Sequence, residues 1–147
     1  MADLKGIIRL RRFQLDEKRQ ALAGWHRFAD EIRADRARLD QSIEAEKQIA
    51  LAADDPNTAL AFGNFVRSAL ERRKRLEESL AKIEAQIEVA TEEVRSAYAD
   101  LKRFEQTQAQ RESRETARRA RSDTAQLDEI GLETFRRRAA AGEARRS

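Results

Sequence analysis

The sequence predicts an all-α protein: a long antiparallel two-helix coiled-coil hairpin with a short C-terminal helix or tail. Three observations carry this prediction: a sustained apolar repeat, a composition that is rich in charge and poor in aromatic residues, and a single break beside the only proline. Together they favour long paired helices over a compact bundle.

The apolar repeat is clearest in residues 76–104. Apolar side chains recur there at alternating steps of four and three, and most residues between them are charged or small. An average spacing of 3.5 residues is typical of a helix that buries a narrow seam against another helix. At about 1.5 Å per residue, the repeat is roughly 43 Å long. The positions of this seam are Leu76, Leu80, Ile83, Ile87, Ala90, Val94, Ala97, Leu101 and Phe104.

Composition supports an elongated molecule. Charged residues make up 39% of the 147 residues and aromatic residues only 5%, so the chain has few bulky side chains for a thick core. One proline and five glycines leave few turns. The length fits a single domain, which we expect to be one helical hairpin over residues 1–147.

The first helix is predicted at about residues 3–52. Charged side chains interrupt its seam at Arg11, Lys18, Arg36 and Glu46, where pairing is weaker or the aliphatic stems lie over the seam with their charged groups in water. A glycine precedes Trp25, and we expect it to make room for the indole against the second helix. The apolar seam positions are Leu4, Ile8, Leu15, Leu22, Trp25, Ala29, Ile32, Leu39, Ile43 and Ala50.

The turn is predicted at residues 53–58. Asp55 precedes Pro56 and is therefore pushed out of the α-helical region. Asn57 or Thr58 is expected to cap the next helix. Two arms of similar length on either side of one break are expected to fold back as an antiparallel pair.

The second helix is predicted at about residues 59–121. The apolar repeat stops after Phe104, so we expect its last part to be solvated and unpaired. Residues 122–147 are expected to form a short amphipathic helix and a disordered basic tail. The apolar residues of that short helix are Leu127, Ile130, Leu132 and Phe135.

Residue content argues against an enzyme or a cofactor site. The chain lacks cysteine, which excludes disulfides and thiolate metal sites and fits a cytoplasmic protein. It has no P-loop motif and no apolar run of membrane-spanning length, and charges interrupt the apolar start too often for a signal peptide. Its single histidine, His26, is expected to be an exposed helix residue or, alternatively, a pH-sensitive contact to a partner. Carboxylate pairs such as Glu77/Glu78 and Glu92/Glu93 have no expected pocket that would shift their pKa values.

The turn end carries one candidate binding surface. Phe62 and Phe65 are three residues apart, on one face of the second helix. They either close the hairpin tip by packing inward or form an exposed apolar patch that docks a partner.

Arginine clusters form the other candidate surface. In an antiparallel hairpin the start of the first helix and the end of the second are neighbours, so basic groups would gather at the open end. In one interpretation these basic groups keep the protein soluble and interact favourably with the dipole at a helix C-terminus. In the other they dock onto an acidic surface of protein or nucleic acid. The cluster residues are Arg9, Arg11 and Arg12 with Arg118, Arg119 and Arg121; Arg136, Arg137 and Arg138 follow.

Two stretches resemble the FliJ family of flagellar export proteins and its relatives in type III secretion injectisomes. NTALAFGNFVRSALERRKRLEESL is similar to the opening of that family's second helix, and QRESRETARRARSDTAQLDEIGLETFRRRAA is similar to its closing segment. The resemblance spans most of the chain. The basic run at residues 72–75 departs from the family's mixed polar and apolar pattern, and the loop is shorter, so the family's gate-contact residues on the first helix are left unplaced in this sequence.

The resemblance implies a non-enzymatic stalk in the cytoplasm, peripheral to the inner-membrane export apparatus. Its open end (Arg9, Arg11, Arg12, Arg118, Arg119 and Arg121) would face the hexameric export ATPase ring. Its tip (Phe62 and Phe65) would face the cytoplasmic domain of the membrane export gate, and export chaperones are further partners. Two alternatives remain open: a homodimeric coiled-coil scaffold or chaperone-like adaptor paired through the seam, and a basic helical protein associated with nucleic acid.

Overall fold

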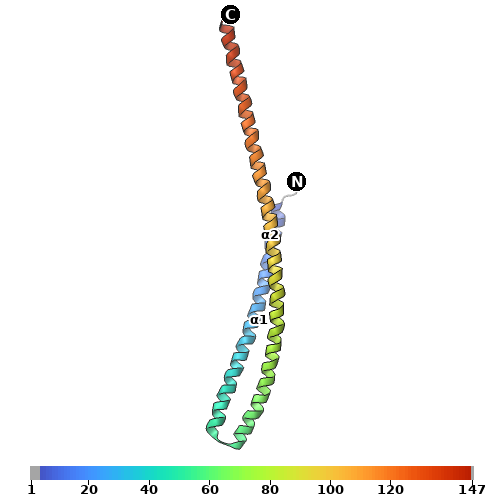
Figure 1. Cartoon of the computed structure of the whole chain (residues 1–147), viewed down its shortest axis with the longest axis vertical. Coiled ribbons are helices and arrows are strands. Elements are labelled where there is room, and N and C mark those ends of the chain that lie inside the picture. The colour runs from blue at the N-terminus through green and yellow to red at the C-terminus, as the bar shows by residue number, and fades with distance from the viewer. Residues whose placement is uncertain (1–3, 147) are drawn as a thin grey trace. The chain divides into compact units, whose positions relative to one another are not determined.

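The computed structural model describes residues 4–146, which form two α-helices and no strand (Figure 1). Helix α1 is Leu4–Ala53 and helix α2 is Pro56–Arg146. The two long helices pack against each other, which confirms the predicted all-α hairpin. The chain divides into two compact units, the hairpin Arg9–Leu101 and a second unit of Met1–Ile8 with Lys102–Ser147.

The hairpin buries one narrow stripe from each helix. Its buried residues include Leu15 and Ala29 on α1 and Leu80, Ala90 and Leu101 on α2. All other apolar positions of the two predicted seams between Arg9 and Leu101 are half-buried. Among the described residues no polar or charged residue is buried, so the apolar stripe supplies the packing that holds the helices together.

Ion pairs cross from helix to helix beside this stripe. Lys18 Nζ lies 3.0 Å from Glu93 Oε2, and Arg33 Nη2 lies 3.4 Å from Glu84 Oε1. Nearer the turn, Arg73 Nη1 lies 3.4 Å from Asp40 Oδ1. Residue numbers rise along α1 as those of their partners fall along α2, so these pairs mark an antiparallel register.

The turn consists of Asp54 and Asp55. Asp54 has a φ of 46°, the left-handed conformation that commonly ends a helix. Asp55 caps α2: its Oδ1 accepts the N–H of Asn57 at 3.2 Å, its Oδ2 accepts the hydroxyl of Thr58 at 3.3 Å, and its carbonyl accepts the N–H of Ala59 at 3.0 Å. The prediction that Asn57 or Thr58 caps the helix is therefore wrong. Pro56 occupies the first helical position, where its missing N–H costs nothing.

Gly24 does not make room for the Trp25 indole, contrary to the sequence prediction. A Cβ built at Gly24 would meet only the Arg27 guanidinium, 3.8 Å away. The indole is half-buried and lies beside Phe28, with ring centroids 6.1 Å apart. Its packing therefore does not depend on the glycine.

In the second unit, Leu4 and Ile8 of α1 are buried, and Phe104 and Gln108 of α2 are half-buried. From Thr116 to Arg146 every residue is exposed. The structure differs here from the sequence prediction, because α2 continues unbroken through residues 122–146 instead of ending near 121. Alanine, arginine and glutamate are strong helix formers, and extending an existing helix avoids the cost of nucleation.

Candidate partner-binding surfaces

At the hairpin tip the two predicted phenylalanines differ in accessibility. Phe62 is half-buried, whereas 37% of Phe65 is exposed. Phe62 is therefore the less accessible of the two rings, and Phe65 has ring surface open to solvent.

Other apolar residues near the turn are more exposed than either phenylalanine. Ile49 and Leu51 lie at the end of α1, and Leu60 and Leu70 lie on α2. The apolar repeat did not identify them, because none of them occupies a seam position. Ile49 and Leu51, for example, flank the seam residue Ala50. Leu60, Phe65 and Leu70 are five residues apart, or about 140° around the helix at each step. The tip thus offers apolar contacts in several directions and not along a single stripe.

The start of the hairpin carries a mixed basic and apolar face. Arg9 and Arg12 are exposed, and so are Leu10 and Phe13, which the sequence reasoning missed. At about 100° per residue Arg9, Leu10 and Phe13 share the side of α1 that faces away from buried Leu15, and Arg12 lies about 60° from Leu15, at the flank of the seam. Phe13 is 61% exposed, so this surface has an aromatic contact among its arginines.

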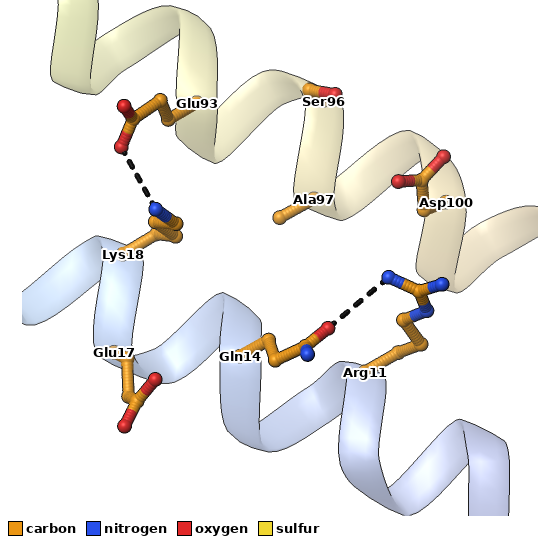
Figure 2. Close-up of a pocket in the computed structure, with 8 residues that line it drawn as sticks. All are labelled: Arg11, Gln14, Glu17, Lys18, Glu93, Ser96, Ala97 and Asp100. Atoms are coloured by element: carbon orange, nitrogen blue, oxygen red, sulfur yellow. Dashed lines mark hydrogen bonds and ion pairs between the residues drawn. The ribbon is translucent and has the colours of Figure 1, made fainter.

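Arg11 is placed differently from the other two arginines of its cluster, Arg9 and Arg12. It is half-buried, and its Nη1 donates a hydrogen bond to Gln14 Oε1 at 3.2 Å. It interrupts the seam, as predicted from its register, and extends toward the turn of α2 that carries Asp100 (Figure 2). Arg11 is thus part of the inner face of the hairpin, whereas Arg9 and Arg12 are exposed.

A polar groove of about 510 Å³ lies between the two helices at this place (Figure 2). The Lys18–Glu93 ion pair bridges it. The groove has two basic and three acidic side chains and is open to solvent, so it has neither the enclosure nor the strong charge excess of a ligand site. Its lining residues are Arg11, Gln14, Glu17, Lys18, Glu93, Ser96, Ala97 and Asp100.

The later arginines, Arg118, Arg119 and Arg121, belong to the second unit, whereas Arg9 and Arg12 belong to the hairpin. All three are exposed. Arg118 and Arg119 both pair with the Glu115 carboxylate, Arg119 through its Nε at 3.4 Å. Arg114, one helical turn before Arg118, is also exposed and extends this basic stretch. Its spacing of four from Arg118 would have identified it in the sequence.

The two carboxylate pairs and the single histidine lie at the surface. No three His, Cys, Asp or Glu side chains in residues 4–146 form a group that could hold a metal ion. Glu77 pairs with Arg73, and Glu92 pairs with Arg95, so these carboxylates belong to the charged surface of α2. His26 is exposed. No helix in the described part of the chain has an apolar stretch long enough to cross a membrane.

Comparison with known proteins adds no relative: no protein-family model, curated protein or solved structure matches the chain.

Proposed function

We propose that this protein is a non-enzymatic stalk component of a flagellar or type III protein export apparatus. It couples the export ATPase ring to the membrane export gate and thereby promotes export. The observation that carries the proposal is the separation of two unlike surfaces on one hairpin. From Phe13 to the end of α1 at Ala53 is about 60 Å of helix, with a basic and aromatic face at one end and apolar side chains at the other.

The arginines are the contacts proposed for the ATPase ring. Arg9 and Arg12, and separately Arg118, Arg119 and Arg121, are exposed guanidinium groups. Such groups attract and orient an acidic partner surface through electrostatic complementarity and bidentate hydrogen bonds. Arg11 has a smaller part, because it is half-buried at the inner face of the hairpin.

The tip residues are the contacts proposed for the cytoplasmic domain of the gate. Phe65 provides an accessible ring, and Phe62 lies three residues earlier in a half-buried position. Leu60, five residues before Phe65, adds exposed apolar area on another side of α2. Binding through these side chains keeps the protein at the inner membrane by protein partners alone, and export chaperones are occasional further partners.

The hairpin favours this function over a homodimer that pairs through the seam. Leu15 and Ala29 of α1 and Leu80 of α2 are already buried within one chain. A seam homodimer would have to open that packing before it could form. A stiff hairpin can instead transmit a bias from a partner at one end to a partner at the other.

The test measures ATP turnover and hexamer formation by the export ATPase with and without the full chain. We expect the chain to raise both, and the triple variant Arg118→Glu, Arg119→Glu, Arg121→Glu to lose most of the increase. Glu71→Arg, Glu78→Arg, Glu88→Arg is the control, with three exposed charges reversed on the hairpin. Unchanged turnover and assembly at saturating chain would overturn the ATPase part of the proposal.

A second measurement addresses the tip. Phe65→Ser should weaken binding to the gate's cytoplasmic domain at least tenfold, because it removes the accessible ring. Tyr98→Ser removes an exposed ring from the open end of the hairpin, far from the tip, and should leave binding unchanged. Equal effects of both variants would exclude the tip as the contact.

A further inference from the structure

The last part of α2 carries apolar side chains that nothing in its unit covers. Residues 123–146 are exposed throughout, including Leu127 and Phe135, which are 69% and 70% exposed. Ile130, Leu127, Phe135 and Leu132 follow one another around the helix within a sector of about 200°. Their side chains form one broad face, which we call the terminal apolar face. An uncovered face of this kind marks a binding surface.

Charge in the same segment is divided into two halves of opposite sign. Residues 123–133 contain four carboxylates and no basic residue, which gives a formal charge of −4. Residues 136–146 contain five arginines and one glutamate, which gives +5 − 1 = +4. The carboxylates are Asp123, Asp128, Glu129 and Glu133; the later charges are Arg136, Arg137, Arg138, Arg145, Arg146 and Glu143.

We propose that the terminal apolar face binds the same face of a second copy of this chain, with the two helices antiparallel. The segment is complementary to itself only in that orientation. An antiparallel pair centred between Thr134 and Phe135 places each −4 half against a +4 half, whereas a parallel pair places like charges together. Such a pair has two-fold symmetry, as most homodimer interfaces do.

The apolar residues fit the same arrangement. Phe135 lies near the two-fold axis and meets Phe135 of the second copy. Leu127 and Ile130, on the acidic half, lie opposite the small side chains of Ala139–Ala141 on the second copy. Large residues then face small ones, which lets the two helices approach closely.

Charge balance also decides against other occupants. The segment from Asp123 to Arg146 has a formal charge of zero, and its first half would be repelled by lipid or nucleic-acid phosphates. The interface is short, about 36 Å of helix, so we expect a dimer that dissociates in the micromolar range. This association uses neither the tip nor Arg118, Arg119 and Arg121, and it does not depend on the proposed stalk function.

The first experiment is sedimentation equilibrium of the full chain with two charge-reversal variants. The acid variant is Asp128→Arg, Glu129→Arg, Glu133→Arg; the base variant is Arg136→Glu, Arg137→Glu, Arg138→Glu. The wild type should form dimers that weaken at least tenfold in molar salt. Each variant alone should be monomeric under conditions where the wild type is a dimer, and an equal mixture of the two should form heterodimers.

The control is again Glu71→Arg, Glu78→Arg, Glu88→Arg, which makes the same change in net charge as the acid variant but on the hairpin. It should dimerise like the wild type. Circular dichroism of every variant reports whether helix content is retained. A monomeric wild type that instead binds phosphatidylserine vesicles or RNA would overturn the proposal, as would dimers of either variant alone.

Orientation is tested with single cysteines, since the chain has none of its own. Thr134→Cys lies at the proposed centre and should form an intermolecular disulfide readily. Thr124→Cys lies about 32 Å from its counterpart in the antiparallel pair and should not. Rapid crosslinking of Thr124→Cys would show a parallel pair and overturn the proposed orientation.

Discussion

Two neighbouring aspartates make the turn, and their energetic effects are opposite. Asp54 has a φ of 46°, a conformation that costs a side-chain-bearing residue about 1 kcal/mol or more. Asp55 stabilises α2 by satisfying the N–H of Asn57 and the hydroxyl of Thr58. A substitution at Asp54 can therefore stabilise the protein, whereas Asp55 already stabilises the start of α2.

Asp54→Gly should raise the free energy of unfolding by about 1 kcal/mol, because glycine adopts positive φ without a steric penalty. Urea unfolding followed by circular dichroism measures the change. Ala52→Gly, two residues earlier within α1, should lower the same quantity by about 1 kcal/mol. A loss of stability in Asp54→Gly would mean that its side chain contributes more than its backbone conformation costs.

At this scale the sequence predicts the place of the turn but not its cap. Pro56 marks the break, because the residue before a proline avoids the α-helical region. Because the same rule places Asp55 outside the helix, the residues after the proline were predicted to cap it. A proline at the first helical position makes the preceding residue the cap, and the sequence Asp55-Pro56 has this pattern.

For each helix, the period of apolar residues was sufficient to place the seam. From Leu15 on α1 and from Leu76 on α2, the predicted apolar positions lie on the buried or half-buried stripe of the hairpin. The seam follows from spacing alone, because a 3.5-residue repeat keeps one face of a helix toward its partner. Cross-helix ion pairs do not follow in the same way. Lys18 and Glu93 are far apart in sequence, and their pairing depends on the register between the helices.

The charge swap Lys18→Glu with Glu93→Lys tests that register. Each single substitution should lower the free energy of unfolding by about 0.5–1 kcal/mol at low salt, since both side chains are about half exposed. The double variant should recover most of the loss. In molar salt the coupling between the two positions should vanish. Additive losses at low salt would place these two residues apart in solution.

The end of α2 is where sequence patterns were least informative. Ser122, Asp123 and Thr124 are typical residues for starting a helix, and they suggest a boundary after residue 121. Such residues are also tolerated inside a helix that already exists. Thr124 bonds its hydroxyl to the carbonyl of Ala120 at 2.9 Å, within the helix. The preference of these three residues for helix N-termini is thus outweighed by the extension of the existing helix.

Across the whole molecule, the candidate surfaces depend on exposure, which a sequence pattern does not give. Phe65 and Arg9 were predicted from position and chemistry, and both are exposed. Phe13 was overlooked because it sits among arginines near the chain start, although it is more exposed than Phe65.

Hydrogen exchange should separate the two units of the molecule. Backbone amides of residues 76–101, along the buried stripe, should exchange many times more slowly than those of residues 116–146 in dilute solution. The later residues form helix without side-chain cover, so local opening there is easy. Raising the protein concentration should slow exchange in residues 123–146 if the second copy binds there. Equal protection in both regions at high dilution would contradict the difference in burial.

The two-residue turn also has a consequence for synthesis. A chain made from its N-terminus completes α1 before any of α2 exists, so the stripe with Leu15 and Ala29 first emerges from the ribosome uncovered. At roughly 5–20 residues per second, the ribosome needs about 2–9 s to make Pro56–Leu101. During that interval the nascent chain closes from the turn backward, and its earliest residues are the last to find their partners.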